Sequence, residues 1–228
     1  MINQVDRAVV LAAGLGTRLK WLTAGQPKAM MDVAGEPSIV HVIRRLAGQG
    51  ISDIAINVHH HAEKLVDYLG DGSKFGARLY YSYEEKLLDS GGGVRKAMDL
   101  LPESGLIAVH NADVLADIDI QQLAAVAVSE GGSLAMVNNP PHHPLGDFGL
   151  NDGLIVNDKH PSYTYSGVSV WDGKVFRVFE SGEMFSLTLP MRLVMDQLKL
   201  TGALHHGEWF DIGRPRDLMQ ARLVAKRR

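Results

Sequence analysis

The stretch VVLAAGLGTRLKWLTAGQPKAMMD, residues 9–32, decides the fold of this chain. Its apolar start, 9–13, predicts a buried strand that ends at a glycine-rich loop, 14–18. The loop offers backbone N–H groups and ends in the cation Arg18, and ten residues later a turn presents a second cation, Lys28. Unhindered N–H groups with two cations favour a polyphosphate ligand.

Strand and helix patterns alternate after this stretch. Apolar runs predict strands at 51–58, 78–83, 106–110 and 133–138. Helical periodicity predicts helices at 37–47, 61–69 and 120–127, and a further helix runs to Leu101 from a second glycine loop, 89–93. The alternation predicts an α/β fold, in which a Rossmann-like, mostly parallel central sheet is flanked by helices.

The pattern changes after Pro140. Residues 147–157 and 163–171 have the turns and alternation of antiparallel strands, and we expect a small antiparallel insertion that covers the sheet. A helix over 187–199, a strand or hairpin within 202–211 and a last helix from about 214 complete the chain. We expect a single domain, 1–228.

Composition excludes several classes of protein. With 228 residues and 46% hydrophobic residues, the chain can bury a large core. A net charge of −3 does not favour nucleic acid, and the absence of cysteine excludes disulfides and a thiolate site. Because neither a signal peptide nor a membrane span is recognisable, we expect no membrane association and a cytoplasmic protein, either a monomer or a small homo-oligomer.

Three other interpretations of the chemistry are weaker. The dinucleotide fingerprint fails because its third glycine position is Leu19, and no G-x-x-x-x-G-K-[ST] motif occurs. Ten histidines raise the possibility of a zinc enzyme, but no H-E-x-x-H spacing is present. The first loop could also be a turn with a purely structural role.

The two cationic motifs belong to a specific set of motifs that covers nearly the whole chain. The set is LAAGLGTRL (11–19), PKAM (27–30), GEP (35–37), LDSGGG (88–93), NAD (111–113), Phe148, YSGVSV (165–170) and WFDIG (209–213). This arrangement resembles the sugar-1-phosphate nucleotidyltransferases. Within that family the detail is closest to the N-acetylmuramate-1-phosphate uridylyltransferases of cell-wall recycling, with mannose-1-phosphate guanylyltransferases as the alternative. A non-catalytic nucleotide-sugar sensor on the same fold is a further alternative.

The resemblance implies a reaction and its residues. A sugar 1-phosphate attacks the α-phosphate of a nucleoside triphosphate, for which we expect UTP with GTP as the alternative, and pyrophosphate leaves. The implied catalytic residues are Arg18, Lys28 and Asp113, and the implied cofactor is Mg²⁺, held by Asp113 and Asp211. The nucleotide would bind residues that gather in the first half of the chain, namely Leu11, Ala12, Ala13, Gly14, Gly16, Thr17, Arg18, Glu84, Ser90, Gly91 and Gly92.

The same resemblance divides the domain by role. Residues 1–139 would mainly bind the nucleotide, 140–213 would mainly bind the sugar and supply the second metal ligand, and 214–228 would form a C-terminal helix. We expect the sugar at Asp147, Asp158, Ser166 and Gly167. Extra C-terminal length of the kind found in acetyltransferase-fused relatives is missing, so we expect no second activity.

Several of these residues have a simpler alternative, and three positions depart from the family pattern. Glu84 could be a solvated surface residue, Asp147 a turn residue and Asp211 a helix N-cap. The departures are Trp21 in place of proline, Ala112 in place of glycine, whose β-carbon could crowd the metal, and Tyr165 in place of asparagine.

Overall fold

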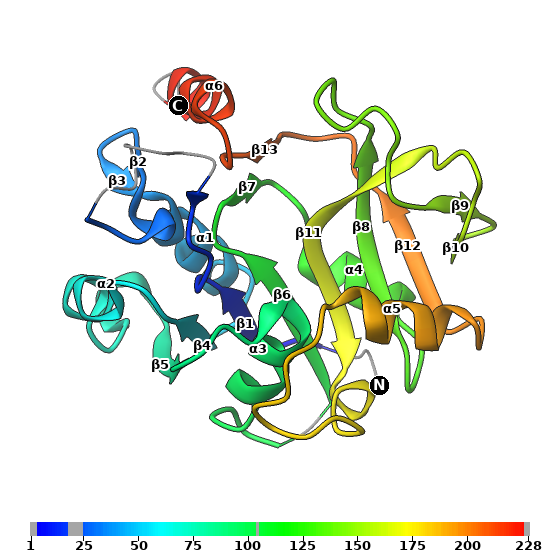
Figure 1. Cartoon of the computed structure of the whole chain (residues 1–228), viewed down its shortest axis with the longest axis horizontal. Coiled ribbons are helices and arrows are strands. Elements are labelled where there is room, and N and C mark those ends of the chain that lie inside the picture. The colour runs from blue at the N-terminus through cyan, green and yellow to red at the C-terminus, as the bar shows by residue number, and fades with distance from the viewer. Residues whose placement is uncertain (1–3, 18–24, 104, 226–228) are drawn as a thin grey trace.

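A nine-stranded sheet runs through the computed structural model, which describes residues 4–17, 25–103 and 105–225. The strand order is β5-β4-β1-β6-β11-β8-β12-β10-β9, and all but β10 and β11 run in one direction (Figure 1). The strands are β1 (Arg7–Leu11), β4 (Asp53–Val58), β5 (Arg78–Tyr83), β6 (Leu106–Asn111), β8 (Gly132–Asn138), β9 (Gly149–Asn151), β10 (Leu154–Val156), β11 (Tyr163–Asp172) and β12 (Leu200–Leu204). The predicted α/β fold with a mostly parallel sheet is confirmed.

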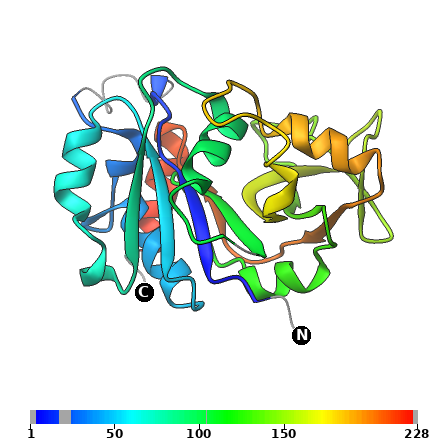
Figure 2. The ribbon, with the colours of Figure 1, turned by 90° about the horizontal axis from the view of Figure 1, so that it is seen from below.

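Helices cover both faces of this sheet. They are α1 (Ser38–Ala47), α2 (Ala62–Leu69), α3 (Asp89–Met98), α4 (Ile120–Val126), α5 (Thr188–Met195) and α6 (Pro215–Ala225), with 3-10 turns η2 (Lys28–Met30), η3 (Ser73–Phe75) and η4 (Gly173–Val175). Figure 2 shows α2 in cyan at one end of the molecule and α5 in orange at the other. None of the helices in the described part of the chain has the length and apolar character needed to cross a bilayer.

Alternation along the central strand explains the two layers of helices. In β1, Ala8 and Val10 pack with apolar residues of α1, α2 and α4, whereas Val9 packs with those of α3 and α5. Successive side chains of a strand point to opposite faces, so a strand that is apolar throughout must be covered on both sides. The apolar run at the start of the opening stretch therefore belongs in the middle of a sandwiched sheet.

The antiparallel part differs from the expectation of an insertion that covers the sheet. β11 lies inside the sheet, antiparallel to both β6 and β8. The reason is its composition: Val168 and Val170 pack into one core cluster and the fully buried Trp171 into the other. β9, β10 and β12 then extend the sheet at its edge.

Two further boundaries are corrected. The helix predicted over 187–199 ends at Met195, since Leu198 adopts a left-handed backbone conformation with φ of 56° and β12 begins at Leu200. The segment 202–211 is not a hairpin: β12 pairs with β8 in the main sheet, whereas β13 (Trp209–Asp211) pairs with β7 (Val114–Ala116). A second small sheet joins β2 (Asp32–Val33) to β3 (Glu36–Pro37).

Candidate active site

Two cavities meet at the carboxyl ends of β1 and β6. The first has a volume of about 640 Å³ and is lined by Leu11, Ala12, Ala13, Gly14, Leu15, Gly16, Thr17, Lys28, Ala29, Asn57, Glu84, Leu87, Asp89, Ser90, Asn111, Ala112, Asp113, Met184 and Gly213. The second, of about 250 Å³, is lined by Asn111, Asp113, Val114, His142, His143, Thr164, Tyr165, Ser166, Gly167, Trp209, Asp211 and Arg214. Asn111 and Asp113 line both, so ligands of the two cavities would meet at these residues.

The glycine-rich loop forms one wall of the first cavity. Gly14 has open space where a β-carbon would stand, and Gly16 has φ of 64°, a conformation that favours glycine. The chain therefore turns sharply after β1 with little side-chain bulk over its backbone. Arg18 and Trp21 lie outside the described residues, and so does Leu19.

A buried amide holds the start of this loop. Asn57 Oδ1 accepts hydrogen bonds from the backbone N–H groups of Ala12 at 2.7 Å and Ala13 at 3.3 Å. Asn57 Nδ2 donates to Glu84 Oε1 at 2.8 Å, and Glu84 Oε2 accepts from the Leu88 N–H at 3.0 Å. Because Asn57 takes the N–H groups of Ala12 and Ala13, an anion in this cavity has to be bound further along the loop, at 14–17.

Glu84 is therefore not the solvated surface residue that its neighbours suggested. Its side chain is buried, and both carboxylate oxygens accept protein hydrogen bonds. A carboxylate can accept about four hydrogen bonds, so Glu84 can still accept one from a ligand in the cavity that it lines.

Lys28 and Asp113 form an ion pair at the floor of the first cavity. Lys28 opens η2, and Ser38 at the start of α1 lies between the carbonyl oxygens of Ala29, at 3.0 Å, and Ala112, at 3.2 Å. This hydroxyl fixes the lysine turn against the end of β6. The β-carbon of Ala112 belongs to the apolar core cluster, so the residue that replaces the family's glycine also packs inward.

Asp113 and Asp211 come together although 97 intervening residues separate them. Asp211 pairs with Val114 across the β7–β13 ladder, and the Ile212 N–H donates to the Asp113 carbonyl at 2.9 Å. Asp211 Oδ1 accepts from the Gly213 N–H at 2.9 Å, two residues before α6 begins, so it stabilises the turn and is not the N-cap. Two adjacent carboxylates beside a phosphate-sized space can hold a hard divalent cation.

Gly213 makes room for the cluster of Lys28, Asp113 and Asp211. A β-carbon there would lie 2.9 Å from Asp211 Oδ1 and 3.2 Å from Lys28 Nζ. Glycine therefore allows the lysine and both carboxylates to share one small volume.

The second glycine segment has a different position from the one expected of a binding loop. Ser90 lines the first cavity, but Gly91 and Gly92 lie buried within α3 and are not among its lining residues. A β-carbon on Gly91 would lie 2.4 Å from the Phe185 ring, and one on Gly92 would lie 2.2 Å from the Glu183 carbonyl oxygen. These glycines let α3 pack closely against the 183–185 segment, which in turn places Met184 in the cavity wall.

The residues expected to bind the sugar divide into two groups. Ser166 and Gly167 line the second cavity, at an irregularity in the β11–β8 pairing, and the Ser166 carbonyl accepts from Trp209 Nε1 at 2.8 Å. Asp147 and Asp158 do not line it. Asp147 Oδ2 accepts from a backbone N–H at 2.9 Å, and Asp158 Oδ1 accepts from another at 3.0 Å within its own turn.

Tyr165 and Asp147 share a local hydrogen-bond network. The Tyr165 N–H is the group that Asp147 binds, and the Tyr165 hydroxyl lies 2.8 Å from Ser169 Oγ. Burial raises the pKa of Tyr165, which keeps the hydroxyl protonated at neutral pH. Asp147 therefore fixes the backbone at one wall of the second cavity.

Several lining residues were missed from the sequence. Asn57 and Asn111 are polar residues at the carboxyl ends of parallel strands, where ligands of open α/β sheets bind, and that rule could have identified both. Asp89, Trp209 and Gly213 belong to the motifs LDSGGG and WFDIG, which could have marked them. Other lining residues carry no local signal because folding alone brings them to the cavities; they include Leu87, Met184, Thr164, His142, His143 and Arg214.

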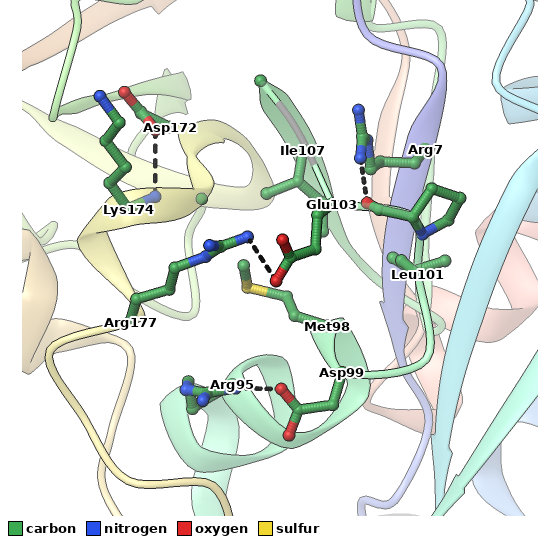
Figure 3. Close-up of a pocket in the computed structure, with 13 residues that line it drawn as sticks. Arg7, Arg95, Met98, Asp99, Leu101, Glu103, Ile107, Asp172, Lys174 and Arg177 are labelled. Atoms are coloured by element: carbon green, nitrogen blue, oxygen red, sulfur yellow. Dashed lines mark hydrogen bonds and ion pairs between the residues drawn. The ribbon is translucent and has the colours of Figure 1, made fainter.

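A third cavity, of about 580 Å³, lies at the opposite end of β1, and its arginines are already paired (Figure 3). Arg95 binds Asp99 at 2.5 Å, and Arg177 faces Glu103 at 3.5 Å. Arg7 Nη1 donates to the Pro102 carbonyl. Carboxylates and a carbonyl oxygen of the protein already bind these arginines, whereas the first cavity also offers the backbone of the glycine-rich loop, so the paired cavities at Asp113 are the better candidate for an anionic ligand.

Known proteins share both the sequence and the fold. The N-acetylmuramate alpha-1-phosphate uridylyltransferase of Neisseria meningitidis serogroup B is 35% identical over 227 residues, which cover 96% of this chain and 98% of that protein. The enzyme of the same description from Caulobacter vibrioides is 31% identical, with 97% and 96% covered. A solved putative glucose-1-phosphate thymidylyltransferase from Bacillus anthracis superposes with a TM-score of 0.85 at 22% identity, covering 96% of this chain and 95% of that one, and supports the fold alone.

The family follows from these matches. A family model described as nucleotidyl transferase matches residues 7–227, nearly the whole chain. With two relatives above 30% identity over almost their full length, the chain belongs to the nucleotidyl transferase family and is a sugar-1-phosphate nucleotidyltransferase.

Proposed function

We propose that the protein transfers a uridylyl group from UTP to N-acetylmuramate 1-phosphate and releases pyrophosphate. The observation that carries this proposal is the junction of two cavities at Asp113, beside Lys28. The first cavity has the size and the backbone loop for a nucleoside triphosphate, and the smaller second cavity suits a sugar. The two relatives described as N-acetylmuramate alpha-1-phosphate uridylyltransferases support the choice of both substrates.

The residues would act mainly by charge neutralisation and positioning. Backbone N–H groups at 14–17 bind the β- and γ-phosphates, and Arg18 offsets charge on the departing pyrophosphate. Lys28 holds the sugar phosphate close to the α-phosphorus, which the sugar-phosphate oxygen attacks in line. No covalent nucleophile from the protein is required.

The carboxylate pair fits a magnesium ion. Mg²⁺ binds one or two carboxylates together with phosphate oxygens and water, and Asp113 with Asp211 would provide two. Among the described residues, no group of three or more His, Cys, Asp or Glu side chains is arranged for a metal. When bound, Mg²⁺ would withdraw negative charge from the phosphate oxygens.

The base would lie near Glu84, whose carboxylate accepts N–H donors. Uracil N3–H and guanine N1–H with N2–H₂ are donors at the ring nitrogen of the base-pairing edge, whereas adenine has an acceptor, N1, at that position and its donor only at the exocyclic N6–H₂. We therefore expect UTP or GTP in preference to ATP, and the relatives support UTP.

A substrate matrix tests the proposal. The four nucleoside triphosphates are each incubated with several sugar 1-phosphates and Mg²⁺, and pyrophosphate release is measured. We expect the highest kcat/KM for UTP with N-acetylmuramate 1-phosphate. A preference for GTP with mannose 1-phosphate would assign a guanylyltransferase instead, and the absence of release from every pair would favour a sensor.

A further inference from the structure

Arg214 places a guanidinium group in the second cavity. It lies between Asp211 and α6 and is half-buried. Its side chain makes no hydrogen bond or ion pair with the described residues, whereas Lys28 binds Asp113. A partly buried guanidinium whose five N–H donors have no acceptor among the described residues is suited to binding an anion.

The position of Arg214 in the chain strengthens this conclusion. The Leu218 N–H donates to the Arg214 carbonyl at 3.0 Å, and Pro215 is the first residue of α6, so Arg214 occupies the N-terminus of an eleven-residue helix. A cation is unfavourable at that end because the helix dipole is positive there. Asp217 lies in the first turn of the same helix and faces the dipole, and an anion bound in the cavity would offset the charge of the guanidinium as well.

The anion has to differ from the reacting phosphate. The sugar phosphate would lie where the two cavities meet, near Lys28 and Asp113, whereas Arg214 lines only the second cavity. His142 lines the same cavity and can donate a further hydrogen bond to an acidic group, whereas Nε2 of His143, which also lines it, lies 3.0 Å from Asp147 Oδ1. The cavity that would bind the sugar thus has cationic and donor groups beyond those that a phosphate needs.

We propose that Arg214 binds a carboxylate substituent on the acceptor sugar and so selects acidic over neutral sugar 1-phosphates. This inference rests on the proposed function, since it assumes that the acceptor occupies the second cavity. A planar carboxylate matches the two parallel N–H donors of a guanidinium, which a lysine ammonium does not reproduce.

Two acceptors that differ in one carboxylate test the inference. N-acetylmuramate 1-phosphate carries a lactyl ether that N-acetylglucosamine 1-phosphate lacks. The full-length protein with UTP and Mg²⁺ is assayed with both, as wild type, Arg214→Gln and Arg214→Lys. The control is Arg216→Gln, because Arg216 is exposed on the same helix and does not line the cavity.

The measured quantity is the kcat/KM for the acidic acceptor divided by that for the neutral one. We expect Arg214→Gln to lower this ratio about ten- to hundredfold, mainly by raising KM for the acidic acceptor. Arg214→Lys should restore part of the ratio, and Arg216→Gln should leave it at the wild-type value. Equal losses on both acceptors would overturn the inference and make Arg214 a phosphate or folding residue. A wild type that does not use the acidic acceptor would instead refute the proposed function and this inference with it.

Discussion

Asn57 is a buried side chain that limits where phosphates can bind. It accepts from two N–H groups at the start of the glycine loop and donates to Glu84. We expect Asn57→Ala to lower kcat/KM for the triphosphate about ten- to hundredfold, because the loop is then misplaced. The same change should cost about 1–3 kcal/mol in the free energy of unfolding, since buried groups lose their partners. Steady-state kinetics and denaturant unfolding measure the two effects.

Asn57→Asp tests the bond to Glu84 separately from the bonds to the glycine loop. Aspartate keeps the acceptor for Ala12 and Ala13 but presents a carboxylate to Glu84 Oε1 instead of a donor. We expect this variant to be at least as impaired as Asn57→Ala at neutral pH. Wild-type kinetics for Asn57→Asp would show that the bond to Glu84 has no part in positioning the loop.

The carboxylate pair gives a second prediction at this scale. Asp113→Asn and Asp211→Asn should each lower kcat about 10²–10³-fold, because a neutral amide is a poor magnesium ligand. Circular dichroism and thermal unfolding should show that both variants remain folded. Asp152→Asn, at the exposed turn between β9 and β10, is the matched control and should retain full activity. Normal turnover in either site variant would exclude that residue as a metal ligand.

At the scale of elements, the packing of α3 against the 183–185 segment shapes the first cavity. Gly92 is the closest contact, since its β-carbon would meet the Glu183 carbonyl oxygen at 2.2 Å. Gly92→Ala should therefore destabilise the fold by about 1–3 kcal/mol, the usual cost of overpacking. It should also raise KM for the triphosphate, because displacing this segment moves Met184 in the cavity wall.

A second glycine serves as the control for this packing. Gly173 has an ordinary backbone conformation, and a β-carbon there would lie 3.2 Å from the end of the flexible Met98 side chain and 3.7 Å, an ordinary contact, from the Gly105 carbonyl oxygen. We expect Gly173→Ala to change stability by about 0.5 kcal/mol or less and to leave KM unchanged. Comparable losses in both variants would mean that close packing is not the reason for glycine at position 92.

At the scale of the whole molecule, His110 makes the stability of the fold depend on pH. It is buried in β6, with Nδ1 2.9 Å from the Asn111 carbonyl, to which Nδ1–H donates. Burial lowers the pKa of His110 from 6.5 to about 4. Between these values the unfolded chain binds a proton that the folded chain does not, so stability is full above about pH 6.5 and falls as the pH drops towards 4.

The full shift corresponds to about 3 kcal/mol. Urea unfolding of wild type, His110→Asn and His160→Asn at pH 7.5 and pH 4.5 measures it. We expect His110→Asn to lose distinctly less stability on acidification than the wild type does, whereas His160→Asn, in an exposed turn, should behave as the wild type does. The same pH dependence in all three proteins would exclude His110 as the cause.

Local chemistry and periodicity could be predicted from the sequence, but contacts between residues distant in the chain could not. The strand at 51–58 was predictable, and a polar residue near its end could be expected to face a ligand. That Asn57 holds the glycine loop and Glu84 together depends on β1, β4 and β5 lying side by side. For the same reason the sequence left Glu84 open between a nucleotide contact and a solvated residue, and it could not show that Gly91 and Gly92 lie buried within α3.

The sequence by itself determined the α/β class, the strand–glycine loop–Lys28 arrangement and the family, because these follow from local periodicity and from motifs that are contiguous in the chain. Only the tertiary structure decided that β11 lies inside the sheet, that two cavities meet at Asp113 and that Asp211 lies beside it. The physical reason is that burial and charge pairing join residues separated by tens of positions. Arg214 shows this difference most clearly: its sequence marks only the start of a helix, and the fold places it in a cavity.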